Sequence, residues 1–253
     1  MNIGPPASGT HRGPELLGQT IVVIGGSGGI GLETARQARC EGAEVILTAR
    51  DSERLQRAAS ELGALRTAAF DANDPASLER VFVDLPTPID HIMVTGAGPR
   101  YWPLMEMDFE QARLAISEHI LLALWVARSA ASKVRPGGTL LFMGGTGARR
   151  PARGLALVSA ATAAMPAFVA GLALDLAPVR LNLIAAGFVG TPLSASLLGD
   201  DLDARRDQLC ATLPIRRVVG PADVAALAVH IMVNEALTGA TYDIDGGQQL
   251  VPG

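Results

Sequence analysis

Lysine, tyrosine and cysteine are scarce in this chain of 253 residues. The one lysine is Lys133, and neither tyrosine, Tyr101 or Tyr242, stands four residues before it. Chemistry that needs a tyrosine and a lysine in adjacent turns of one helix is therefore excluded. The two cysteines, Cys40 and Cys210, lie far apart and lack both a CxxC pair and a nearby histidine. We expect no disulfide and no metal site, and a reducing, cytoplasmic environment.

A basic excess and a long apolar run are also missing. The net charge of −4 argues against a nucleic-acid partner, because such proteins gather Lys and Arg on one face. The longest apolar stretch, residues 116–131, contains Ser117, Glu118, His119 and Arg128, which predicts no membrane span. Residues 1–18 lack the apolar segment of a secretory signal and are rich in Gly, Pro and Ser. They are predicted to form a flexible tail.

Short aliphatic runs alternate with longer helical patterns along the rest of the chain. The runs IVVI, VILT and TLLFM are almost continuously apolar, as in parallel strands that are covered on both faces. Strands are predicted at 20–24, 44–48, 65–70, 91–95, 139–143, 180–185 and 240–244. Helices are predicted at 29–41, 52–62, 75–84, 108–133, 152–176 and 221–233. The alternation predicts an α/β fold, a Rossmann-like doubly wound parallel sheet with helices on both faces, in one domain over 19–253.

A glycine-rich turn follows the first predicted strand and leads into a helix. It reads Gly25-Gly26-Ser27-Gly28-Gly29-Ile30-Gly31. Glycines permit a tight turn in which a pyrophosphate approaches backbone N–H groups, and the helix N-terminus adds partial positive charge. A second strand ends about 18 residues further on, as a dinucleotide-binding unit requires. We interpret this turn as a dinucleotide site rather than a simple tight βα turn.

The end of the second strand bears on which dinucleotide is bound. NAD-binding folds usually place an acidic residue here to hold the ribose hydroxyls, whereas this chain has Ala49 followed by Arg50. Arg50 can pair with a 2′-phosphate, so NADP(H) is preferred over NAD(H). The alternative is a solvated arginine paired with Asp51 or Glu53.

Together these residues resemble the short-chain dehydrogenase/reductase family over roughly residues 18–250. The spacing Gly25-x3-Gly29-x-Gly31 is similar to the family's cofactor loop, and the ending TGATYDIDGGQQL is similar to its C-terminal pattern. The resemblance implies further cofactor contacts after strands three, four and six: Asp71, Ala72, Gly96, Ala97, Gly187, Val189 and Thr191. It also implies a homodimer or homotetramer.

The family's catalytic positions have all changed in this chain. Gly145 occupies the position of the serine, Val158 that of the tyrosine and Thr162 that of the lysine, and His119 stands about where the family has an asparagine. Hydride transfer to a carbonyl leaves an alkoxide that needs a proton, and Val158 has none to donate. Thr162 can still hydrogen-bond a ribose hydroxyl, more weakly than a lysine would.

Three residues are candidates to replace the missing proton donor. His119 can donate because imidazole titrates near neutrality, or it is a helix histidine bonded to a backbone carbonyl. Tyr101 follows strand four in a loop that lines the substrate cleft of similar proteins, or it packs on Trp102. Thr146 stands beside the vacant serine position. The pair Arg149 and Arg150 either attracts an anionic substrate or is solvated.

Two functions remain open from the sequence. The first is an atypical NADP(H)-dependent oxidoreductase acting on a small molecule, in which His119, Tyr101, water or the substrate handles the proton. The second is a non-catalytic NADP(H)-binding sensor or scaffold. The segment 192–214 mixes apolar and charged residues and identifies no substrate.

Overall fold

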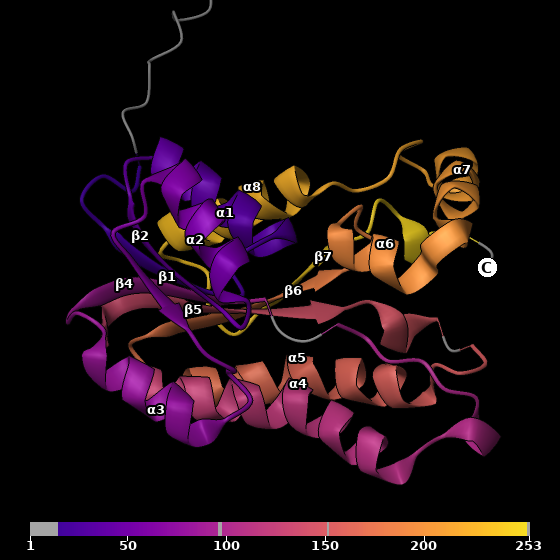
Figure 1. Ribbon diagram of the computed structural model, residues 1–253, viewed down its shortest axis with the longest axis horizontal. Coiled ribbons are helices and arrows are strands. Elements are labelled where there is room, and N and C mark those ends of the chain that lie inside the picture. The colour runs from indigo at the N-terminus through magenta and orange to yellow at the C-terminus, as the bar shows by residue number, and fades with distance from the viewer. Residues whose placement is uncertain (1–14, 96–97, 151, 252–253) are drawn as a thin grey trace, which may run out of the picture.

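The computed structural model describes residues 15–95, 98–150 and 152–251, in which seven strands form one parallel sheet (Figure 1). The strand order is β3-β2-β1-β4-β5-β6-β7. The strands are β1 (Thr20–Ile24), β2 (Glu44–Ala49), β3 (Arg66–Ala69), β4 (Ile89–Val94), β5 (Val134–Gly145), β6 (Arg180–Ala186) and β7 (Thr241–Ile244). The predicted fold class is confirmed.

Helices cover both faces of this sheet. In Figure 1, α1, α2 and α8 lie on one face, and α3, α4 and α5 lie on the other. Their bounds are α1 (Gly29–Cys40), α2 (Ser52–Leu62), α3 (Pro75–Asp84), α4 (Phe109–Ala130), α5 (Ala156–Asp175) and α8 (Pro221–Val233). Two further helices, α6 (Pro192–Leu198) and α7 (Leu202–Thr212), stand at the carboxyl ends of the strands.

The continuous apolar runs form strands because both of their faces are buried. Val22 and Ile46 pack into the core under α3, α4 and α5, whereas the alternate residues Val23 and Leu47 pack into the core under α1 and α8. All four side chains are fully buried. Burying a side chain of this size stabilises the fold by about 1.5–3 kcal/mol.

Residues 15–18, which the sequence predicts to lie in a flexible tail, are ordered. Residues 1–14 lie outside the described part of the chain, but residues 15–18 form a turn and not a flexible segment. Leu16 is fully buried in the core beneath α1, and its N–H donates to the carbonyl of Glu41 at 3.0 Å. One apolar side chain with a place in the core is enough to order this turn.

The segment 192–214 folds into helices that the sequence did not predict. Thr191 caps α6 by accepting the N–H of Ser194 at 3.2 Å, and Pro192 occupies the first turn, where its missing N–H costs nothing. Leu209 is the buried residue of α7. Short helices with so few buried residues leave little hydrophobic periodicity in the sequence.

Helix α5 is long and apolar enough to cross a membrane by length and composition, with a mean hydropathy of 1.9. Its buried residues include Val158, Met165 and Val169, and it contacts β5, β6 and α4. One third of the apolar window is buried inside the protein, and the core helix of a protein passes the same test as a membrane span.

The topology determines where a ligand can bind. The strand order reverses between β1 and β4, and α6 and α7 stand beyond the carboxyl ends of the strands (Figure 1). Ligands of open α/β sheets bind in the crevice at such a reversal.

Candidate cofactor and substrate site

The glycine-rich turn is held tightly between the ends of three strands. Gly25 has φ +91°, a conformation that L side chains rarely adopt, and a Cβ atom here would collide with the hydroxyl of Thr95. That hydroxyl donates to the carbonyls of Ile24 and Gly25 at 3.1 and 3.3 Å. The N–H groups of Gly25 and Gly26 donate to the carbonyl of Thr48 at 2.9 Å. The turn is therefore rigid before any ligand arrives.

The first turn of α1 is suited to an anion. Its N-cap residue is Gly28, which has no side chain to accept the first N–H groups of the helix. These groups and the helix dipole are open to a phosphate. Gly29 and Gly31 begin this helix, and a Cβ atom on Gly29 would lie 3.6 Å from Thr191, so the turn faces the segment after β6.

A cavity of about 330 Å³ adjoins this turn. It brings together five residues that the sequence predicts to contact the cofactor: Gly25, Ser27, Arg50, Asp71 and Ala72. The carboxylate of Asp71 accepts the N–H of Asn73 at 3.0 Å, which orders the loop after β3. Residues that are far apart in the sequence thus line the same cavity.

Arg54 is a further cation of this cavity that sequence reasoning missed. A Cβ atom on Gly28 would lie 2.8 Å from its guanidinium, so the side chain reaches from α2 back over the glycine turn. Arg50 precedes the N-cap residue Asp51, and Arg54 stands in the first turn of α2, so no helical spacing relates the two arginines. Only the fold shows that both line this cavity.

Arg50 itself does not make the ion pairs considered as its alternative. Asp51 caps α2 by accepting the N–H of Arg54 at 3.0 Å, and Glu53 faces Arg57 at 3.9 Å. Arg50 is exposed and has no carboxylate partner among residues 15–95, 98–150 and 152–251. Its charge is available to a ligand.

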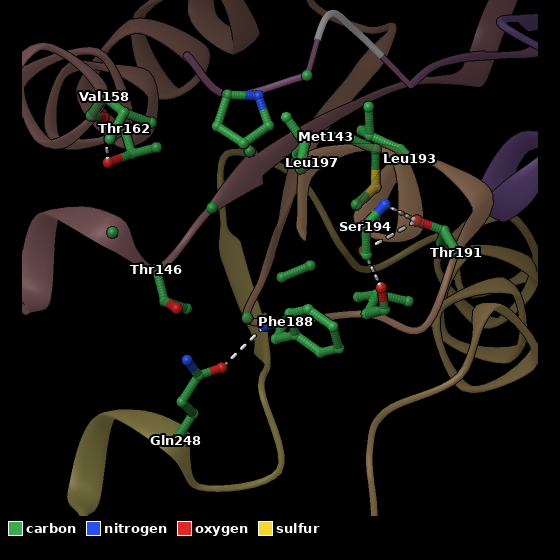
Figure 2. A pocket seen from close by; sticks show the side chains of 18 of the residues that line it. Met143, Thr146, Val158, Thr162, Phe188, Thr191, Leu193, Ser194, Leu197 and Gln248 are labelled. Atoms are coloured by element: carbon green, nitrogen blue, oxygen red, sulfur yellow. Dashed lines mark hydrogen bonds between the residues drawn. The ribbon is translucent and has the colours of Figure 1, made fainter. Parts of the chain in front are cut away.

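A second cavity, of about 820 Å³, lies across the carboxyl ends of β4, β5 and β6. Both cavities are lined by Gly98, Glu118, Leu122 and Leu193, so the two adjoin each other. The large cavity brings together eight further predicted site residues: Ile30, Tyr101, His119, Thr146, Thr162, Gly187, Val189 and Thr191. The predicted contacts Gly29 and Gly31 lie in the first turn of α1 and line neither cavity. Gly96 and Ala97 lie outside the described residues. Met143, Phe188, Leu193 and Leu197 give the cavity apolar walls (Figure 2).

The three positions that hold the family's catalytic serine, tyrosine and lysine all line this cavity, but here they carry other residues. Val158 and Thr162 stand one turn apart on α5, and Gly145 ends β5 opposite them. The Thr162 hydroxyl donates to the carbonyl of Val158 at 2.8 Å (Figure 2). Because its proton is used within the helix, Thr162 can offer a ribose only an acceptor.

His119 reaches the cavity from α4 with one nitrogen already engaged. Its Nδ1 lies 2.9 Å from the carbonyl of Ala115, so Nδ1 carries the hydrogen and donates it. The carbonyl bond considered as the alternative role is therefore present. It leaves Nε2 free, as an acceptor in the neutral ring and as a donor only in the imidazolium.

Tyr101 is half exposed in the loop after β4 and lines the same cavity. Burial of the phenol raises its pKa above 10.0, and the charge of Arg205 partly opposes this shift. The hydroxyl of Tyr101 therefore stays protonated through the neutral range and can donate.

The two arginines after β5 have different roles. Arg149 forms an ion pair with Asp243 and does not line the cavity. Arg150 lines it and donates to the carbonyl of Gln248 at 2.7 Å. Gln248 and Arg205 also line the cavity and were not predicted from the sequence.

The doubly wound sheet, the glycine turn at its reversal and the cleft across its strand ends define a Rossmann-type α/β protein. The family model described as "Enoyl-(Acyl carrier protein) reductase" matches residues 25–249. The chain therefore belongs to this family of short-chain dehydrogenases and reductases.

Individual relatives agree with this assignment. The chain is 28% identical to a cyclic-di-GMP-binding biofilm dispersal mediator protein of Escherichia coli, over 91% of this chain and 97% of the relative. It matches the structure of the MalC reductase/Diels-Alderase from Malbranchea aurantiaca with a TM-score of 0.87 and 25% identity, over 94% of this chain and 98% of MalC. It also matches BdcA in complex with NADPH, with a TM-score of 0.81 and 26% identity, over 92% and 95% of the two chains.

Proposed function

We propose that this protein is an NADP(H)-dependent oxidoreductase with an atypical active site. The observation that carries the proposal is that the two cavities adjoin, so that their lining extends from Arg50 to Thr191, as an extended dinucleotide requires. When bound, NADPH supplies a hydride. BdcA, a similar protein solved with NADPH, supports the same cofactor class.

The preference for NADP(H) rests on the positive charge at the end of β2. Arg50 has no carboxylate to neutralise it within the described ranges, and Arg54 adds a second guanidinium over the turn. Guanidinium groups bind phosphates through paired, charge-assisted hydrogen bonds. A 2′-phosphate in this cavity is therefore favoured over a bare ribose.

The proton that completes carbonyl reduction must come from a group other than the family's tyrosine and lysine. Hydride addition to a carbonyl carbon leaves an oxyanion, and Gly145, Val158 and Thr162 present no donor to it. His119, Tyr101, water or the substrate then supplies the proton. Hydride addition to an iminium carbon, in contrast, gives a neutral amine and needs no further proton.

Substitutions separate His119 from Tyr101 as proton donors. Tyr101 stays protonated through neutral pH because burial raises its pKa, so a rate that depends on it is flat there. If Tyr101 donates, we expect Tyr101→Phe to lower this flat profile and His119→Gln to leave it unchanged. If His119 donates, we expect the opposite result.

Incubation of the purified protein with NADPH and a panel of carbonyls, imines and activated alkenes tests the proposal. Loss of NADPH absorbance with at least one class is the expected result. If NADPH binds and none of the compounds oxidises it, the oxidoreductase proposal is wrong.

The replacement of all three donors favours a second candidate, a non-catalytic nucleotide-binding protein. The chain is similar to an E. coli protein that is named for cyclic-di-GMP binding. In this case NADPH binds without turnover, and His119→Gln and Tyr101→Phe change only stability. The same panel therefore decides between the two candidates.

We also propose that two copies associate through α4 and α5. Leu114, Leu121 and Leu124 are each at least 38% exposed and lie along one stripe of α4. The exposed face of α5 carries small residues, among them Ala167 and Gly171, which permit close helix approach. Light scattering should show a dimer, and Leu114→Glu with Leu121→Glu should give a monomer. Leu65→Glu, at an exposed leucine elsewhere, is the control; a monomeric wild type contradicts the proposal.

A further inference from the structure

The large cavity carries positive charge that the protein does not neutralise. Its one lining carboxylate, Glu118, is held by Arg100 at 2.8 and 3.1 Å. Arg150 and Arg205 also line the cavity, and within the part of the chain that the structure describes neither has a carboxylate partner. Arg150 donates to the Gln248 carbonyl at 2.7 Å and Arg205 to the Gln208 amide at 2.8 Å. Both partners are neutral.

Gln248 points its amide donors into this cavity. Its side-chain oxygen accepts the N–H of Phe188 at 2.8 Å, and since a backbone N–H can only donate, this contact fixes the orientation of the carboxamide. Figure 2 shows the oxygen turned to Phe188 and the nitrogen turned toward Thr146. The NH₂ group has no acceptor among the described residues.

The backbone around Gln248 holds this orientation firmly. The buried carboxylate of Asp245 accepts the N–H groups of Gly247 and Gln249 at 2.8 and 3.0 Å. A Cβ atom on Gly187 would lie 2.6 Å from the Gln248 side-chain oxygen, so only glycine permits this close approach.

Thr146 adds a third donor at the same place. It is 9% exposed, and its hydroxyl has no hydrogen-bond partner in the described ranges although it faces the cavity. Its N–H donates to the carbonyl of Ala186 at 3.1 Å, which places it beside the Phe188 segment that Gln248 holds. The hydroxyl is thus accessible from the cavity and can donate to a ligand oxygen.

We propose that Thr146, Gln248 and Arg150 form an anchor for a carboxylate on the substrate, with Arg205 adding attraction from α7. The three donor side chains line the same cavity, and Arg150 lies against the Gln248 backbone. Arg150 and Arg205 are cations without a carboxylate partner in the described residues. This donor set matches two negatively charged oxygens better than a neutral carbonyl. The anchor deepens the proposed function, because it takes this cavity as the substrate site.

Binding of trans-cinnamate and of cinnamyl alcohol, measured by calorimetry on the full chain with NADPH present and absent, tests the anchor. The two ligands share an apolar body and differ in the charged group. We expect cinnamate to bind at least about tenfold more tightly, equivalent to about 1.4 kcal/mol. Equal affinities, or no detectable binding of cinnamate, overturn the proposal.

Variants locate the effect. Gln248→Glu keeps an acceptor for Phe188 N–H but removes the amide donors, Thr146→Val removes the hydroxyl at constant shape, and Arg150→Met removes the charge. Each should weaken cinnamate binding and leave the alcohol unchanged. Arg149→Met is the matched control, because Arg149 pairs with Asp243 outside the cavity. An equal loss in Arg149→Met and Arg150→Met overturns the anchor. Because binding is measured without turnover, a protein that binds cinnamate but never oxidises NADPH contradicts the proposed function alone.

Discussion

Restoring the missing donors should raise the rate at which this protein reduces carbonyl compounds. The triple variant Gly145→Ser, Val158→Tyr, Thr162→Lys returns a hydroxyl, a phenol and an ammonium to positions that line one cavity. The site has room: a Cβ atom on Gly145 would lie 3.4 Å from the Thr162 methyl, an ordinary contact, and Val158 borders a cavity of about 820 Å³.

The expected gain follows from the step that the variant supplies. General acid catalysis is typically worth about 10²–10⁴-fold in rate, which corresponds to about 2.7–5.4 kcal/mol of activation free energy. The gain should appear with ketones and aldehydes. It should be absent with iminium substrates, which need no proton after hydride addition.

The assay is NADPH consumption with a panel of carbonyl compounds, at equal cofactor saturation for every variant. The matched control is Gly145→Ala, Val158→Phe, Thr162→Met, which fills similar volumes without a hydroxyl or a charge. If the restored variant folds and binds NADPH yet reduces carbonyls no faster than this control, the assignment of these three positions is wrong.

Other predictions concern the cofactor and stability. Arg50→Ala should weaken NADPH binding about 10–100-fold and leave NADH binding nearly unchanged, and calorimetry that shows equal losses refutes the phosphate role. Arg54→Ala should weaken both cofactors, since its guanidinium lies over the glycine turn. Arg180 is 5% exposed and donates to five carbonyls, those of Gly137 and of four residues at and after the end of α8. Arg180→Leu should therefore lower the free energy of unfolding, measured in urea, by about 3–5 kcal/mol. A loss below about 1 kcal/mol contradicts this role. Burial lowers the pKa of His91 from 6.5 to about 3, and the charge of Asp90 opposes this shift. As the pH falls, the unfolded state therefore binds a proton before the folded state does. The free energy of unfolding should fall between pH 6.5 and pH 3, by up to about 1.4 kcal/mol per pH unit. His91→Gln should flatten this dependence relative to wild type.

The sheet could be predicted from the sequence because parallel strands are buried on both faces. The runs around Val22 and Ile46 have no polar alternation, and helical segments between them leave one reasonable topology. Boundaries were less accurate at β5, which begins at Val134 and not at 139, since Arg135, Pro136 and Gly137 interrupt its apolar pattern.

The candidate site could be predicted where it lies within one segment. The turn around Gly25 and the end of β2 at Arg50 are local patterns with a known geometry. Gln248 could not be found in this way, because its contact with Phe188 spans 60 residues of sequence. Arg205 belongs to α7, a helix with a single buried residue. The sequence therefore predicted neither this helix nor which of its side chains line the cavity.

The most direct test of the cofactor claim is a calorimetric titration of the wild-type protein with NADPH and with NADH. Saturable binding of NADPH, at least about tenfold tighter than that of NADH, is the result that Arg50 and the open first turn of α1 predict. Absence of NADPH binding, or tighter binding of NADH, contradicts the account.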